Sequence, residues 1–166
     1  MAEGAAERMM DADLASRSLG MRLVESGPGV AVVTMRITGI MVNGHRIAHG
    51  GYVFLLADTA FACACNSHGP VTVAASADIT FVAPAHEGDL LVATAVERTR
   101  YGRSGIYDVT VCRDDQVIAE FRGRSRTIGN GQTTDPSEGP TGDPADGGTG
   151  DQADGKPTGS TGGRAN

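Results

Sequence analysis

The chain has 166 residues, with 14 basic and 20 acidic side chains and a net charge of −6 at pH 7. A nucleic-acid-binding protein needs a basic face, so this acidity argues against a nucleic-acid partner. No apolar run reaches the roughly 18 residues of a membrane-spanning helix, and no membrane partner is expected. The N-terminal segment mixes acids with arginine and lacks the apolar core of a secretion signal, which indicates a cytoplasmic protein.

Residues 130–166 differ in composition from the rest of the chain. These 37 residues include 10 glycines, 4 prolines and only three apolar residues, all alanine. Such a segment cannot bury enough apolar surface to offset the entropy of ordering it. We therefore predict a disordered tail over 130–166 that folding and activity do not need. It follows an N-terminal helical segment (1–18) and a single domain (19–129).

The first half of the domain is expected to hold a helix, a strand and a loop. Residues 9–19 predict a short helix that Gly20 ends. Residues 30–38 alternate between apolar and polar side chains, which is typical of a half-buried strand. Residues 39–51 contain four glycines and two histidines, which indicates a loop.

A buried helix and an antiparallel sheet complete the expected fold. Residues 52–67 are apolar on nearly every side, which is typical of a buried helix. Tight turns separate the later strands, so these are expected to run antiparallel. The four expected strands are 71–82, 89–98, 106–113 and 117–128. This is an α+β fold whose sheet curls around one helix. Because the sheet covers only part of the helix, we expect a partner subunit to cover the rest.

Asp58 is the only acidic or basic side chain in the expected helix. A carboxylate among apolar side chains is costly unless it is hydrogen-bonded or functional. The residues alone leave two interpretations open. Asp58 is either satisfied by a neighbouring hydroxyl such as that of Thr59, or it takes part in chemistry.

A second candidate is the segment from Asn43 to His49-Gly50-Gly51, which leads into the helix. Glycine lets a ligand approach the backbone, and the free N–H groups of a helix start attract negative charge. The oxyanion formed from a carbonyl would be stabilised there. The alternative is a plain glycine-rich helix start with ordinary loop residues.

The spacing of these two candidates has a consequence for assembly. Gly50 and Asp58 are eight residues apart, roughly 12 Å along a helix. One small carbonyl centre cannot contact both groups of a single chain. If both act on one centre, a second subunit must supply one of them, and two antiparallel helices about a two-fold axis would do so.

Other polar residues carry weaker signals. Glu120, Arg122, Arg124 and Arg126 alternate along the last strand, as expected for a solvated outer face or for a phosphate-binding stripe. Arg100 and Arg103 at a turn share this ambiguity. The three cysteines include a C-x-C pair without a second ligand pair, which makes a poor zinc site. We expect reduced thiols and no metal or redox cofactor.

The sequence resembles the phenylacetate-pathway (PaaI-type) acyl-CoA thioesterases of the hotdog fold. The resemblance spans about 14–129. Its specific part consists of Asn43-Gly44-His45, Ala48-His49-Gly50-Gly51, Leu56-Ala57-Asp58-Thr59-Ala60-Phe61-Ala62 and Cys65-Asn66-Ser67. Later matches are Phe81-x2-Pro84, Gly88-Asp89, Gly105-x-Tyr107-Asp108 and Phe121-Arg122-Gly123-x-Ser125-x2-Ile128-Gly129.

This resemblance implies a hydrolase acting on phenylacetyl- or hydroxyphenylacetyl-CoA, assembled as a dimer of dimers with sites across the dimer interface. Asp58 matches the catalytic carboxylate, and the Gly50 N–H matches the group that polarises the thioester carbonyl. Asn43 and His49 match side chains that help to bind that carbonyl, and Thr59 matches a neighbour of the carboxylate.

The substrate contacts are less well defined. Gly51 and Phe61 are the candidates beside the helix, and the CoA phosphates are expected to meet the surface arginines Arg100, Arg103, Arg122 and Arg124. Some relatives carry a serine on the strand after the helix that faces the reacting centre. Here that strand reads Val73-Ala74-Ala75-Ser76, and the role of Ser76 stays open.

Two rival functions share this fold. A hydratase or dehydratase acting on a β-hydroxyacyl thioester pairs a histidine with its carboxylate, but no histidine lies one turn from Asp58. A non-enzymatic acyl-CoA sensor would need an output domain, and 130–166 has the composition of neither a helix-turn-helix nor a basic segment.

Overall fold

The computed structural model describes residues 4–129, so the predicted tail lies outside the described residues. The elements, in chain order, are α1 (Ala5–Ala12), α2 (Leu14–Ser18), β1 (Arg22–Gly27), β2 (Val30–Arg36), a 3-10 turn (Gly39–Met41), α3 (Gly50–Asn66), β3 (Val71–Phe81), β4 (Leu90–Tyr101), β5 (Ser104–Arg113) and β6 (Gln116–Gly129). Among the described residues, no helix is both long and apolar enough to cross a bilayer.

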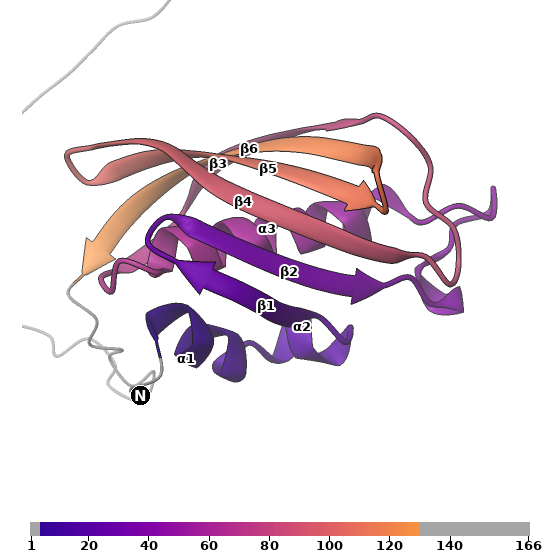
Figure 1. The fold of residues 1–166 in the computed structure, drawn as a ribbon, viewed down its shortest axis with the longest axis horizontal. Coiled ribbons are helices and arrows are strands. Elements are labelled where there is room, and N and C mark those ends of the chain that lie inside the picture. The colour runs from indigo at the N-terminus through magenta and orange to yellow at the C-terminus, as the bar shows by residue number, and fades with distance from the viewer. Residues whose placement is uncertain (1–3, 130–166) are drawn as a thin grey trace, which may run out of the picture. The chain divides into compact units, whose positions relative to one another are not determined.

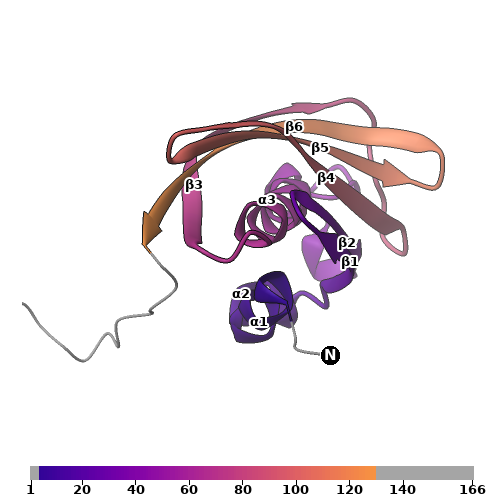
Figure 2. The ribbon, with the colours of Figure 1, turned by 60° about the vertical axis from the view of Figure 1, so that its left-hand side comes forward.

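The six strands form one antiparallel sheet in the order β1-β2-β4-β5-β6-β3. Figure 1 shows α3 lying along the concave side of this sheet. In Figure 2 the sheet arches over α3, with β3 on one flank and β1 and β2 on the other. This confirms the predicted α+β hotdog architecture, in which β1 and β3 are the two free edges.

The core lies between α3 and the concave face of the sheet. Phe61 of α3 is fully buried, with its ring centroid 5.4 Å from that of Tyr107 on β5 and 5.9 Å from that of Phe121 on β6. Gly123 on β6 gives this ring room, since a Cβ there would lie 2.8 Å from the Phe61 ring. Phe61 therefore fills part of the core between helix and sheet.

The N-terminal helical prediction is right in type and wrong in detail. Instead of one helix over 9–19, two short helices meet at Asp13, whose carboxylate accepts hydrogen bonds from the Ser16 N–H (3.0 Å) and hydroxyl (2.6 Å). Such a side chain favours starting a new helix over continuing one. The sequence prediction also missed β1, a short edge strand with half-exposed and exposed side chains and little alternation.

Helices α1 and α2 pack against α3 on the side that the sheet leaves open (Figure 2). Ala6 and Met10 of α1 are buried, and Ser16 of α2 hydrogen-bonds Thr59 of α3 (2.9 Å). Part of the helix surface predicted to need a partner subunit is thus covered by the chain itself. A narrower stripe of half-exposed or exposed residues remains on α3: Gly51, Leu55, Asp58 and Ala62.

Candidate active site

At the start of α3, one backbone N–H has no hydrogen-bond acceptor within residues 4–129. His49 is the N-cap, and its Nδ1 accepts a hydrogen bond from the Gly51 N–H at 3.0 Å. The Tyr52 N–H donates to the His49 carbonyl at 3.0 Å. The Gly50 N–H belongs to the first residue of the helix and finds no acceptor within residues 4–129. The helix dipole adds its positive end at this point, so Gly50 offers a donor for a developing negative charge.

The capping bond also fixes the histidine. Because Nδ1 of His49 accepts a hydrogen bond, the neutral ring carries its proton on Nε2. The ring stands edge-on to Tyr52, with a centroid distance of 6.4 Å. His49 thus holds the helix start in place and still presents one N–H donor. α3 begins at Gly50, two residues before the predicted start, since a histidine cap satisfies the amide of the second glycine.

A pocket of about 560 Å³ opens beside Gly50. Its lining is mostly apolar: Ile47, Ala48, Phe81, Val82, Ala83, Pro84 and Ala85, with Asn43 and Gly50 as the polar points of contact. A Cβ on Gly50 would lie 2.9 Å from Cζ of Phe81. The absence of a side chain at Gly50 therefore lets this aromatic ring lie close to the free amide, a contact that the sequence did not predict.

Asn43 belongs to the loop before α3 and also lines the pocket. Its Oδ1 accepts the His45 N–H at 2.9 Å, which closes the turn before the helix. No acceptor for its NH2 group is found in the described part of the chain. The oxygen therefore organises the loop, as the ordinary-loop interpretation expects, and a ligand contact by the NH2 group stays a prediction.

Asp58 lies in the middle of α3, half-buried, on the stripe that neither the sheet nor α1 and α2 cover. Burial raises its pKa above the ordinary aspartate value. The neighbouring Thr59 does not satisfy it, since the threonine hydroxyl donates to the Leu55 carbonyl (2.9 Å) and contacts Ser16. Within residues 4–129, no hydrogen bond to the Asp58 carboxylate is found. A partly desolvated carboxylate without a partner in the fold is a candidate functional group.

Gly50 and Asp58 belong to one continuous helix, as the spacing argument required. At 1.5 Å per residue their backbone positions are roughly 12 Å apart. The structure therefore does not bring the two principal site residues together within one chain. It does bring Asn43, His49 and Gly50 together at the start of the helix.

The structure places the predicted substrate contacts Phe61 and Gly51 differently from each other. Phe61 is fully buried between α3 and the sheet, where it contacts Tyr107 and Phe121 and faces no surface pocket. Its ring therefore belongs to the core between α3 and the sheet. The Gly51 N–H donates to Nδ1 of His49. Gly51 itself is exposed and lies next to the free N–H of Gly50.

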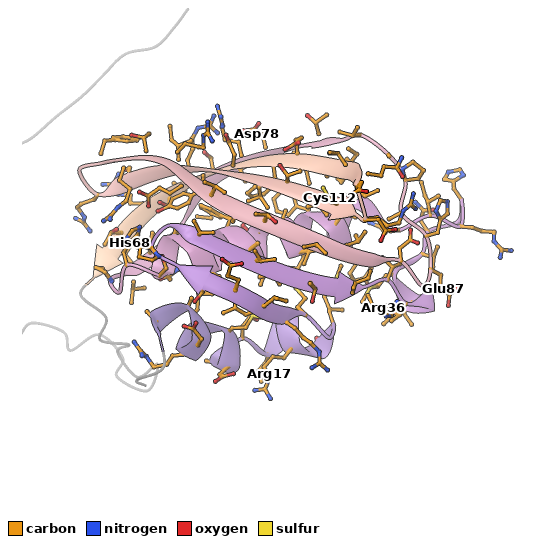
Figure 3. The ribbon with its side chains drawn as sticks, viewed as in Figure 1. Arg17, Arg36, His68, Asp78, Glu87 and Cys112 are labelled. Carbon is orange, nitrogen blue, oxygen red and sulfur yellow. The ribbon has the colours of Figure 1, made fainter. Side chains whose placement is uncertain are left out.

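The arginines proposed for phosphate binding lie on the convex face of the sheet or at its end. Arg122 forms a two-pronged ion pair with Asp108 (2.6 and 2.8 Å), and Arg124 pairs with Asp78 (3.0 Å). Figure 3 shows Asp78 on the side of the sheet away from α3. Arg103 donates from two nitrogens to the Thr127 carbonyl (3.0 and 2.8 Å). This pattern fits the solvated-face interpretation, whereas Arg100 is exposed next to the same turn and forms no ion pair within residues 4–129.

Ser76 and the cysteines lie outside the candidate site. A bulge between Ala74 and Ser76 shifts the register of β3, so Ser76 pairs with Arg124 and shares its outward face. Burial raises the pKa of both Cys63 and Cys65 to about 12, as expected for inert packing thiols. Among residues 4–129, no group of three or more His, Cys, Asp or Glu side chains is arranged to hold a metal ion.

Comparison with known proteins identifies the class. Residues 45–120 match the family model described as "Thioesterase superfamily". A putative esterase of Archaeoglobus fulgidus is 36% identical over 124 residues, which are 74% of this chain and 80% of that protein. The chain belongs to the thioesterase superfamily and is a thioester hydrolase.

Within this class, the chain is similar to the acyl-coenzyme A thioesterase PaaI of Escherichia coli (strain K12). The two are 44% identical over 125 residues, 75% of this chain and 89% of that protein. The solved structure of the E. coli PaaI protein, from the phenylacetic acid degradation operon, superposes with a TM-score of 0.74 at 42% identity. The superposition covers 76% of this chain and 92% of the E. coli chain. This similarity supports acyl-CoA thioesterase activity and confirms the predicted family.

Proposed function

We propose that the protein hydrolyses an aryl-acetyl-CoA, such as phenylacetyl- or hydroxyphenylacetyl-CoA, to the free acid and CoA. The observation that carries this proposal is the free Gly50 amide at the mouth of an apolar pocket of about 560 Å³. An apolar acyl group fits such a lining, and the amide is placed for its carbonyl oxygen. The name of the E. coli relative, from the phenylacetic acid degradation operon, supports the aryl-acetyl group.

The first step polarises the thioester. The carbonyl oxygen accepts the Gly50 N–H, with the NH2 group of Asn43 and the Nε2–H of His49 as further donors. As the carbonyl carbon becomes tetrahedral, its oxygen gains a negative charge that these fixed donors stabilise. The start of the 17-residue helix α3 adds a favourable dipole.

Asp58 supplies the second function. With its pKa raised by burial, the carboxylate is a stronger base than an ordinary aspartate. It takes a proton from water while the water oxygen forms a bond to the carbonyl carbon, after which the C–S bond breaks and CoA leaves as its thiolate. In the alternative, the carboxylate itself attacks to give a mixed anhydride that water then hydrolyses. Neither route uses a metal or redox cofactor.

The site is completed by a second copy of the chain. Gly50 and Asp58 are too far apart along α3 to meet at one carbonyl, and the Asp58 stripe is the part of α3 left open. The free edge strand β3 also presents the exposed side chains of Val73 and Phe81. We propose that two copies face each other about a two-fold axis and form two composite sites, within a dimer of dimers. The cytoplasmic location stays a prediction.

Complementation between two inactive variants tests the composite site. Gly50→Pro lacks the donor amide and Asp58→Asn lacks the base, so each alone is expected to be inactive. After co-refolding of an equal mixture, half of the dimers are mixed, and each mixed dimer holds one intact site. We expect about one quarter of the wild-type activity per chain. Activity no higher than that of the separate variants would place both groups in one chain and overturn the composite site.

The substrate is tested by comparing phenylacetyl-CoA and hydroxyphenylacetyl-CoA with short and long straight-chain acyl-CoAs. Released CoA is best followed by chromatography, because a thiol dye would also report the half-buried free thiol of Cys112. We expect the highest kcat/KM for the aryl-acetyl esters. Faster turnover of straight-chain esters would contradict the assigned acyl group and leave the thioesterase class intact.

A further inference from the structure

A second, polar basin adjoins the candidate site. It has a volume of about 790 Å³, and its lining consists of Gly39, Val42, Asn43, His45, Arg46, His86 and Glu87. The loop before α3 and the loop between β3 and β4, which form it, lie at the same end of the molecule (Figure 1). Asn43 lines both this basin and the apolar pocket beside Gly50. A ligand reaching from one hollow into the other would therefore pass Asn43.

The basin gathers an arginine and two histidines, and the arginine forms no ion pair within residues 4–129. Arg46 is exposed, and its guanidinium has no hydrogen bond or ion pair among residues 4–129. His45 and His86 are also exposed. The Asp89 carboxylate near His86 is engaged at 2.7 Å by Arg113, and lies 3.9 Å from the His86 ring. Glu87, labelled in Figure 3 at this end of the molecule, is the single acid in the lining.

The loop holds Arg46 in a defined position. Its backbone has a φ of 63°, in the left-handed region that side-chain-bearing residues rarely adopt. The Arg46 N–H donates to the Asn43 carbonyl (2.9 Å), and the Asn43 N–H donates to the Ile47 carbonyl (2.9 Å). A bridge between Val42 and Ala48 closes the loop. Arg46 is thus carried by the same closed loop that positions Asn43.

We infer that this basin binds the phosphate groups of the CoA moiety, with Arg46 as the principal contact and His45 and His86 as supporting donors. The inference rests on the proposed function. Arg46 and Gly50 are four positions apart in the sequence, which limits their backbone separation to about 14 Å. The long Arg46 side chain extends away from this backbone position. In an acyl-CoA, the pantetheine arm likewise places the phosphates at a distance from the thioester. The guanidinium fork suits phosphate oxygens.

The alternative phosphate sites are less well suited. Arg122 and Arg124 are committed to Asp108 and Asp78, and Arg103 is committed to a backbone carbonyl. A phosphate would have to displace these partners, whereas it would meet Arg46 without such competition. Arg100 is the exposed arginine outside the basin that remains as a rival contact, whereas Arg17, which is exposed on α2 and does not line the basin, serves as the matched control.

The test compares two thioesters of the same acyl group, one of CoA and one of pantetheine, which lacks the phosphates. We expect Arg46→Gln to raise KM for the CoA ester about tenfold, the effect of losing roughly 1.4 kcal/mol of binding. Both kinetic constants for the pantetheine ester are expected to stay at their wild-type values. Arg17→Gln should leave both esters unaffected. Glu87→Gln should lower KM for the CoA ester, because it removes the acid that opposes phosphate.

Each contrary outcome is distinct. An equal rise in KM for both esters would show that Arg46 only shapes the loop, and no change for either would place the phosphates elsewhere. Both results overturn the inference. A wild-type enzyme that hydrolyses neither ester would refute the proposed function instead. In that case, calorimetric titration with CoA still decides, since Arg46→Gln must weaken CoA binding about tenfold and Arg17→Gln must not.

Discussion

Gly50→Pro isolates the amide that we assign to the oxyanion. Proline has no N–H, yet it is favoured at the first position of a helix, where that group has no partner within the helix. His49, the preceding residue, has φ −63° and ψ 130°, an extended conformation that a following proline tolerates. The substitution therefore removes one donor and leaves the start of α3 intact.

The expected loss follows from the role of the donor. Removing one fixed oxyanion donor lowers kcat by about 10²–10³, or roughly 2.7–4 kcal/mol of transition-state stabilisation. The free energy of unfolding should change by less than about 1 kcal/mol, because no helical hydrogen bond is lost and the unfolded chain becomes more restricted. Turnover of an acyl-CoA and thermal unfolding of the same preparation measure the two effects.

Gly50→Ala is the matched control. Alanine and proline both place a Cβ 2.9 Å from Cζ of Phe81, so both force this ring to move. Phe81 is 53% exposed and has room to turn away. Only proline removes the N–H, so the ratio of the two kcat values reports the donor alone. A Gly50→Pro enzyme whose kcat stays within about threefold of that of Gly50→Ala would refute the assignment of the oxyanion donor.

Three further substitutions test the surroundings of the site. Burial raises the pKa of Asp58, so its charge opposes folding at neutral pH. Asp58→Asn should raise Tm at pH 7, and the gain should vanish as pH falls below about 3.9, where the carboxyl is protonated in both folded and unfolded chains. Thr59→Val should lower the free energy of unfolding by about 1 kcal/mol in urea titrations, through lost contacts with Ser16 and Leu55, and should leave kcat nearly unchanged. A large fall in kcat would instead restore Thr59 to the catalytic set. Gly123→Ala should destabilise the fold by about 1–3 kcal/mol in the same titrations, since the new Cβ meets a buried aromatic ring; a neutral result would show that the core can shift.

The main elements were predictable from local patterns. Alternation marked most of the strands, and the all-apolar run marked α3, whose lone carboxylate identified the candidate base. The edge strand β1 could not be found in this way, because its side chains are half-exposed or exposed without a clear period of two. Asp13 divides the N-terminal helix through its own hydrogen bonds, a local choice that periodicity does not report.

The site residues were predicted less evenly. The motif from Asn43 to Gly51 gave the donors, but the motif does not show that Phe81 covers Gly50, because that contact joins residues far apart in the chain. Phe61 was predicted as a substrate contact beside the helix, yet it points into the core, because the sequence alone does not show which side of an all-apolar helix faces the sheet. One position along a helix turns a side chain by about 100°. The same rotation separates Thr59, which faces α2, from the open stripe.

Asp58 lies on the open stripe of α3, where its carboxylate has a cost in stability. The sheet covers one side of α3 and the pair α1 and α2 covers part of the other, so a hydrophobic residue at position 58 would complete the apolar surface at lower cost. The acid at this position lowers the free energy of unfolding. Such a loss is expected where a group must stay poorly solvated to act as a base. The stripe that keeps Asp58 accessible is also the surface against which a second helix would fit. Desolvation of the base and completion of the site by a second chain are therefore expected to depend on the same interface.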